Sequence, residues 1–385
     1  MCRKDVRQTE AYFDNSATTK PCAEAAAAAE KAIKEVWGNP SSLHRSGMAA
    51  DDLLTLSRER ISARLNCSPD EIYFTSGGTE SNNTALRGAA LRLKKQGNKI
   101  VSTAVEHPSV YETLSELEKE GFEVIRLKVD GEGKISEDDL FSAVDEKTVL
   151  VSIMAVNNET GSVQPVQAAK RAVARAHSPA LIHCDAVQAF GKMPLKPSSL
   201  GVDLMSISAH KIHGIKGAGT LYIRKGVKIA PLVFGGEQEN KLRPGTQAMP
   251  AIAAFGAAAK ALPDIEKELA SAKKLRDYML SLFAKIGGIE INSPADALPF
   301  ITNISVIGRR SEPMLSFLSE KGVYVSSGSA CSKGKRSRVL SEMGLSAERL
   351  ESPLRISFSR FTTKEEIDCL ADALKQGIEY IRPSK

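Results

Sequence analysis

Long apolar runs are absent from this sequence. No stretch approaches the roughly 18 residues that a membrane-spanning helix needs, so we expect no transmembrane segment and no membrane binding. The N-terminus, residues 1–5, also lacks the apolar core of a signal peptide. These absences predict a protein that stays in the cytoplasm.

Metal and disulfide signatures are absent as well. The six cysteines show no CxxC spacing, and the six histidines form neither an HExxH motif nor a Cys/His array. We therefore expect no metal site and mostly free thiols in a reducing compartment. The net charge of +6 is not gathered in a dominant basic tract, so it gives no reason to predict nucleic-acid binding.

Strand and helix patterns alternate over the first two thirds of the chain. The predicted strands are 71–75, 99–104, 122–129, 148–156, 180–184, 203–208 and 219–223. The predicted helices include 23–36, 51–65, 108–119, 165–176 and 249–260. This alternation is typical of an α/β fold with a mostly parallel sheet covered by helices on both faces.

The last third of the chain predicts a smaller α+β domain. After a helix that ends near residue 285, strands at 300–307, 323–325 and 354–358 alternate with helices at 313–321 and 337–343. A capping-box pattern at 362–365 opens the final helix. We predict a large domain at 1–262 and a small domain at 263–385, with the extreme N-terminus free to pack against the small domain.

Two strand ends carry the residues that suggest chemistry. Asp185 follows the apolar residues 180–182, and Lys211 follows the apolar strand at 203–208. A lysine after a strand is usually a solvated loop residue. An Asp and a Lys delivered together, however, suit a pyridoxal phosphate enzyme. The carboxylate keeps the pyridine nitrogen protonated, and the amine forms a Schiff base with the aldehyde.

A phosphate site is predicted where a strand meets a helix at residues 76–80. Gly78 and Thr79 lie there, and small residues let backbone N–H groups approach an anion at a helix N-terminus. The segment alone is equally consistent with a turn and a helix cap. Ser208 and His210, which flank the lysine segment, are within reach of the same phosphate.

Three further polar residues follow strands and are candidates for cofactor contacts. His107 is either a structural residue or a ring-stacking acid/base. Asn158 lies in a segment that either caps a turn or presents an amide to cofactor and substrate. Gln188, three residues after Asp185, is placed to donate to the phenolic oxygen of the cofactor.

Arg355 and Cys331 are candidates for handling the substrate. Arg355 alternates within an apolar strand, so it needs either a substrate carboxylate or an internal salt bridge. Cys331 lies in a Gly- and Ser-rich loop that also contains several Lys and Arg residues. Those charges favour the thiolate, the reactive form. The same charges also suit a plain solvated loop or a docking surface for an acidic partner.

Taken together, these motifs resemble the cysteine desulfurases, fold-type I pyridoxal phosphate enzymes of the class V aminotransferase superfamily. The resemblance covers nearly the whole chain, through residues 14–19, 38–44, 75–83, 157–159, 183–185, 208–211, 243–246, 326–331 and 360–363. The cysteine loop is similar to that of the group that supplies sulfur for iron–sulfur clusters and thio-modification.

The resemblance implies a role for each candidate residue. Lys211 would be the Schiff base lysine, Asp185 the partner of the pyridine nitrogen, and His107 the ring-stacking proton shuttle. The remaining cofactor contacts would be Gly78, Thr79, Asn158, Gln188, Ser208, His210 and, from the second subunit of a homodimer, Thr246. Asn158 and Arg355 would bind the carboxylate of L-cysteine. Cys331 would take the sulfur as a persulfide, leaving L-alanine, and pass it to an acceptor or iron–sulfur scaffold protein.

Two other classes of function remain open from the sequence. The same fold serves selenocysteine lyases, aminotransferases and other β-eliminating enzymes. A non-enzymatic partner protein that only retains the fold is the third hypothesis, although the complete candidate set disfavours it.

Overall fold

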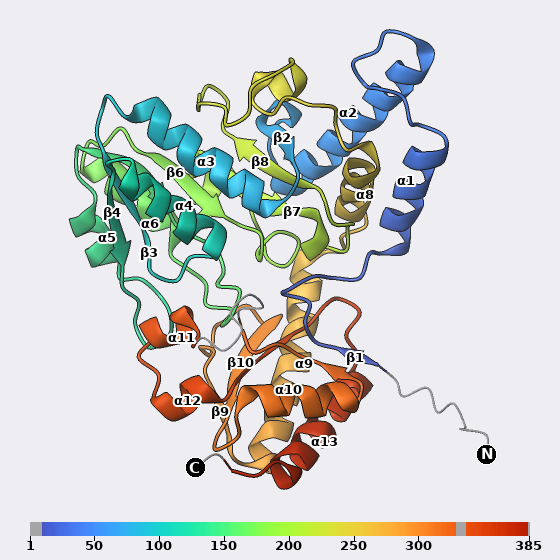
Figure 1. The fold of residues 1–385 in the computed structure, drawn as a ribbon, viewed down its shortest axis with the longest axis vertical. Coiled ribbons are helices and arrows are strands. Elements are labelled where there is room, and N and C mark those ends of the chain that lie inside the picture. Colours follow the sequence, from blue (N-terminus) through green and yellow to red (C-terminus); the bar gives the residue numbers. More distant parts are fainter. Residues whose placement is uncertain (1–9, 329–335, 384–385) are drawn as a thin grey trace.

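A seven-stranded sheet forms the centre of the larger part of the molecule (Figure 1). The computed structural model describes residues 10–328 and 336–383, and within them this sheet has the order β2-β8-β7-β6-β5-β3-β4. Its strands are β2 (Ile72–Thr75), β3 (Lys99–Thr103), β4 (Glu123–Leu127), β5 (Thr148–Ser152), β6 (Leu181–Asp185), β7 (Leu204–Ser208) and β8 (Gly219–Ile223). Strand β8 is antiparallel to both of its neighbours, and the other pairs are parallel. The mostly parallel sheet predicted from the sequence is confirmed.

The central strands are apolar throughout because helices cover the sheet. Every residue of β5, β7 and β8 is buried, as expected for strands that are packed on both faces. Helix α3 packs across β5, β6, β7 and β8, while α1 and α2 both pack against α8. The helices of this part are α1 (Ala23–Lys34), α2 (Arg45–Leu65), α3 (Gly78–Leu93), α4 (Pro108–Lys119), α5 (Glu137–Ala143), α6 (Val166–Arg175), α7 (Pro197–Leu200) and α8 (Met249–Lys260), with short 3-10 turns η1 (Pro69–Glu71), η2 (Ala209–Lys211) and η3 (Gln238–Lys241).

The C-terminal part is built on a second, antiparallel sheet, drawn in orange and red in Figure 1. Strand β10 (Ile301–Val306) pairs with β9 (Ile289–Ile291) on one side and β12 (Pro353–Ser357) on the other. Its helices are α9 (Ile265–Ile286), α10 (Ser311–Glu320), α11 (Arg338–Glu342), α12 (Ala347–Glu351) and α13 (Lys364–Tyr380). None of the helices in the described parts of the chain has both the length and the apolar content needed to cross a membrane.

The N-terminal segment joins the C-terminal part. Strand β1 (Ala11–Tyr12) pairs in parallel with β11 (Val323–Tyr324), and Asp14 forms an isolated bridge with Ser357. The chain then continues past residues 16–19 toward α1. This path brings residues 14–17 to the junction of the two parts of the molecule. The domain boundary near residue 262 stays a prediction.

Element boundaries differ from the sequence-based expectation at identifiable caps. Helix α2 begins at Arg45 rather than at residue 51, because the His44 ring accepts the backbone N–H of Gly47. The capping box of α13 is formed by Thr363 and Glu366, one residue later than predicted. Two adjacent threonines offer two registers, and only the folded chain selects between them. Helices α5 and α12 and strand β9 were not predicted, because each is short.

Candidate active site

A cavity of about 530 Å³ lies at the carboxyl ends of β3, β5, β6 and β7. Crevices at this edge of an α/β sheet are the usual place for a ligand. Most of the residues predicted from the sequence line it, namely Gly78, Thr79, His107, Asn158, Asp185, Gln188, Ser208, His210, Lys211 and Arg355. Thr246 is exposed and is not among the lining residues of this chain. Cys331 lies outside the described residues.

The carboxylate of Asp185 is buried at the end of β6 and is held by two donors. Its Oδ1 accepts the backbone N–H of Val187 at 3.0 Å, and its Oδ2 accepts Nδ2 of Asn82 at 2.7 Å. Asp185 is only 5% exposed. A buried carboxylate is costly unless it is hydrogen-bonded, so these two donors keep the charge in place.

Lys211 lies on the turn η2, directly after β7. Its Nζ donates to the carbonyl oxygens of Ser16 and Ala17, the second at 2.8 Å. Burial, assisted by the charge of Arg355, lowers the pKa of Lys211 to about 8. Near neutral pH a larger fraction of this amine is therefore neutral and nucleophilic than of an ordinary lysine.

The start of α3 fits a phosphate group. Helix α3 begins at Gly78, and Gly77 gives it no side-chain cap. A Cβ on Gly219 would lie 2.6 Å from Cα of Gly77, so only glycine lets β8 approach this turn. Nearby, Oγ of Ser208 is buried and has no hydrogen-bond partner among the described residues. A free hydroxyl beside an uncapped helix N-terminus is a donor set suited to an anion.

His107 is fixed at the start of α4 by its own ring. Its Nδ1 accepts the backbone N–H of Ser109 at 3.1 Å and lies 2.8 Å from Oγ of the same residue. Burial lowers the pKa of His107 below the usual 6.5, and the charges of Lys211 and Arg338 act in the same direction. The imidazole is therefore neutral at pH 7. Burial also lowers the pKa of His210, to about 4, so that this ring meets a phosphate as a neutral group.

The two asparagines after β5 divide the roles that the sequence left open. Oδ1 of Asn157 accepts the backbone N–H groups of Glu159 and Thr160, at 2.9 and 3.1 Å, and so caps the turn. Asn158 lines the cavity instead. Gln188 is held at both ends: Nε2 donates to Ser16 O at 3.0 Å, and Oε1 accepts Nζ of Lys192 at 3.3 Å.

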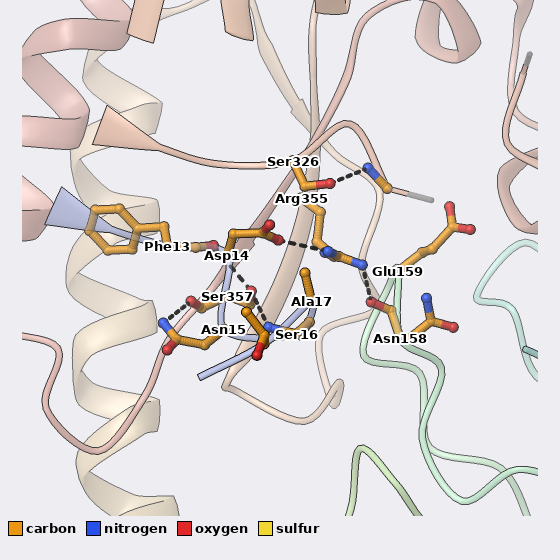
Figure 2. A network of polar contacts seen from close by, with 12 residues as sticks. Phe13, Asp14, Asn15, Ser16, Ala17, Asn158, Glu159, Ser326, Arg355 and Ser357 are labelled. Carbon is orange, nitrogen blue, oxygen red and sulfur yellow. Dashed lines mark hydrogen bonds and ion pairs between the residues drawn. The ribbon is translucent and has the colours of Figure 1, made fainter. Parts of the chain in front are cut away.

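Arg355 lies between two segments far apart in sequence, as Figure 2 shows. Nη2 contacts Oδ1 of Asp14 at 2.7 Å, and Nη1 donates to the carbonyl oxygen of Asn158 at 3.1 Å. The internal salt bridge considered from the sequence is therefore present. Nε of this buried arginine has no partner among the described residues, and the side chain also lines the cavity. Its role toward a substrate carboxylate stays a prediction.

Sequence reasoning missed two buried glutamates of the cavity. Oε1 of Glu106 accepts Oγ1 of Thr103 at 2.9 Å and N–H of Met154 at 2.8 Å, whereas Oε2 has no partner among the described residues. Burial, reinforced by the charge of Asp185, raises the pKa of Glu106 to about 8. Glu159 is buried beside Ser337, and burial raises its pKa as well. The signal was present at residue 106, because an acidic residue directly follows a buried strand.

Comparison with known proteins places this geometry in a family. The model of the family "Aminotransferase class-V" matches residues 11–370. The chain belongs to the class-V aminotransferases. A cysteine desulfurase IscS of Dictyoglomus turgidum is 41% identical over 378 residues, which are 97% of this chain and 95% of that protein. A NifS/IcsS protein homolog of Lactobacillus delbrueckii subsp. bulgaricus is 42% identical over 363 residues, covering 93% of this chain and 94% of that protein.

Solved structures agree with this assignment. A NifS-like protein has a TM-score of 0.92 at 37% identity, and the match covers 97% of this chain and all of that one (100%). The structure of SspA in complex with cysteine has a TM-score of 0.82 at 31% identity, covering 92% of this chain and 100% of that one. Family members of this class are pyridoxal-phosphate-dependent enzymes, and the fold class expected from the sequence is confirmed.

The raised pKa of Glu106 predicts a pH dependence of stability. The unfolded chain loses this proton near pH 4.5, whereas the folded protein keeps it until about pH 8. Stability therefore falls as pH rises through that window. Glu106→Gln retains the acceptor for Thr103 and Met154 but carries no charge. We expect it to flatten the decline and to be more stable near pH 8, by a few kcal/mol at about 1.4 kcal/mol per pH unit.

Chemical denaturation between pH 5 and pH 9 measures this effect. Glu123→Gln, an exposed glutamate on β4, is the matched control and should follow the unmodified protein. If Glu106→Gln and the unmodified protein lose stability in parallel, the buried carboxyl is not the group that titrates.

Proposed function

We propose that this protein is a pyridoxal-phosphate-dependent cysteine desulfurase, which converts L-cysteine to L-alanine and transfers the sulfur to Cys331 as a persulfide. The observation that carries the proposal is the pair formed by Asp185 and Lys211, which line one cavity at neighbouring strand ends. Full-length similarity to cysteine desulfurases supports the same activity.

The residues of the cavity fit the cofactor in three places. Ser208, His210 and the start of α3, with Gly78 and Thr79, would hold the phosphate. Asp185 would hold the proton on the pyridine nitrogen, and Lys211 would bond the aldehyde carbon. Gln188 and Asn158 would contact the ring hydroxyl, and His107 would lie against the ring. Bound pyridoxal phosphate supplies an electron sink for the substrate carbon.

Substrate cysteine would be oriented through its carboxylate. Arg355 is buried and already paired with Asp14, yet its Nε has no partner among the described residues. A carboxylate beside Asn158 would receive this donor and complete the hydrogen bonding of the guanidinium. Arg355 and Asn158 would therefore set the direction in which the cysteine side chain points.

Sulfur transfer requires a nucleophile, which we assign to Cys331. The Cys331 thiolate would attack the substrate sulfur, so that an S–S bond forms while the substrate C–S bond breaks. The electron pair stays with the substrate carbon, which takes a proton, and alanine leaves. The persulfide sulfur would then pass to an acceptor, such as an iron–sulfur scaffold protein. A reducing compartment such as the cytoplasm keeps this thiol available.

We also propose that two copies of the chain form a homodimer, in which Thr246 reaches the phosphate of the partner. Large apolar side chains are exposed around α1 and α2, where Trp37 is 74% and Leu43 95% exposed, and before η3, where Phe234 is 83% exposed. Exposed apolar surface of this kind is typical of an interface. Thr246, shortly after η3, is exposed too and is free to act in a second site.

Product analysis of Cys331→Ala tests the function. The unmodified protein, loaded with cofactor and given L-cysteine with a thiol reductant, should release alanine and sulfide in equal amounts. The variant should lose both products, because no thiolate is left to take the sulfur. Cys369→Ala, which removes an exposed cysteine, is the control and should retain activity.

Other outcomes of the same assay point to the rival reactions. Equal turnover by Cys331→Ala would mean direct elimination without a persulfide. A requirement for a keto-acid acceptor would indicate an aminotransferase, and turnover of selenocysteine alone would indicate a selenocysteine lyase. Absence of a cofactor chromophore would revive a non-enzymatic role.

Light scattering tests the dimer. The unmodified protein should have twice the mass of one 41.4 kDa chain. Leu43→Asp should shift it toward the monomer and weaken cofactor binding, because it places a charge on the exposed apolar surface. Tyr380→Asp, at an equally exposed residue at the end of α13, should leave the mass unchanged. A monomeric mass for the unmodified protein would contradict the proposal.

A further inference from the structure

A chain of hydrogen bonds inside the large domain connects Asp185 to His107. Nδ2 of Asn82 donates to Oδ2 of Asp185 at 2.7 Å and also to Oγ of Ser109 at 2.8 Å. Oγ of Ser109 in turn lies 2.8 Å from Nδ1 of His107. Asn82 is 1% and Ser109 9% exposed, so bulk water does not compete for these groups.

The charge of Asp185 determines the orientation of Asn82. A carboxylate accepts hydrogen bonds and cannot donate one. The side-chain amide of Asn82 must therefore turn its NH₂ group, rather than its oxygen, toward Asp185. The second hydrogen of that NH₂ group then points at Ser109. Consistent with this orientation, the amide oxygen of Asn82 is left without a partner among the described residues.

The orientation of Asn82 determines that of the Ser109 hydroxyl. Oγ of Ser109 accepts from Asn82, so the serine proton is free to be donated, and Nδ1 of His107 is the acceptor within range. The backbone N–H of Ser109 points at the same nitrogen, at 3.1 Å. Two donors converge on Nδ1, which leaves no room for a proton on that atom.

We propose that Asn82 and Ser109 are positioning residues that hold neutral His107 in the tautomer protonated at Nε2. His107 lines the cavity, and Nδ1 is turned to the helix, so the proton-bearing edge is the one left for a ligand. Nε2 makes no hydrogen bond to any described side chain or backbone group.

The catalytic meaning of this tautomer rests on the proposed desulfurase function. Neutral His107 offers the cavity a proton donor, not a base, because its only lone pair lies in the relay. It is therefore suited to donate a hydrogen bond or a proton to an anionic atom of the bound substrate. Acceptance of a proton from the substrate would have to occur at another group, or after Nε2 has first given up its own proton.

The tautomer is measurable without turnover. We suggest long-range ¹H–¹⁵N NMR of the cofactor-loaded protein with ¹⁵N-labelled histidine, in which His107→Gln identifies the signal among the six histidines. We expect Nε2 protonated and Nδ1 unprotonated at neutral pH. In Ser109→Ala one hydrogen bond to the neutral ring is lost, so the midpoint of His107 protonation should rise by about half to one pH unit.

Two further variants separate a positioning role from a structural one. Ser109→Thr keeps a hydroxyl and should restore the midpoint of the unmodified protein. Ser115→Ala removes a serine of the same helix that bonds the Tyr111 carbonyl and Arg126, not His107, and should leave the midpoint unchanged. The other charges that act on His107, those of Asp185, Lys211 and Arg338, are the same in all of these proteins.

The proposal is overturned if Nδ1 carries the proton, or if Ser109→Ala and Ser115→Ala titrate alike. Neither result depends on sulfur transfer. A protein that shows the expected tautomer but fails to desulfurate cysteine would contradict the proposed function and leave the relay intact.

Discussion

The buried charge of Asp185 is the interaction on which the rest of the cavity depends. It opposes the lowering of the pKa of Lys211 and His107 by burial, and it adds to the raised pKa of Glu106. It also fixes the direction of Asn82 and, through Ser109, of the histidine proton. A single carboxylate at a strand end thus influences an amine, an imidazole and a second carboxyl, because the surroundings are shielded from water.

The fold makes this concentration of charge possible. Parallel strands deliver their carboxyl ends to one edge, and covering helices exclude water from both faces of the sheet. The N-terminal segment adds the carbonyl groups of Ser16 and Ala17, which hold Lys211, and the carboxylate of Asp14, which holds Arg355. Both parts of the molecule must therefore be in place before the cavity is complete. This arrangement allows substrate binding to be coupled to their relative position.

Most of the residues that line the cavity were predictable from sequence, because each follows an apolar strand or precedes a helix. Asp185 and Lys211 are examples, and the edge at which they meet follows from the parallel sheet. What could not be predicted are contacts set by tertiary structure alone. Asn82 bonds a carboxylate 103 residues away, and Arg355 pairs with Asp14 across 341 residues. Local pattern has no information on such pairs, nor on which of two adjacent threonines caps α13.

The most direct test of the account asks which lysine bonds the cofactor. Lys192 is the rival, because burial lowers its pKa to about 7, below that of Lys211. However, Lys192 is held by Gln188 and does not line the cavity, whereas Lys211 does. Borohydride reduction of the cofactor-loaded protein, followed by peptide mass spectrometry, locates the bond. The account predicts pyridoxyl phosphate on Lys211; a label on Lys192, or no label, would contradict it.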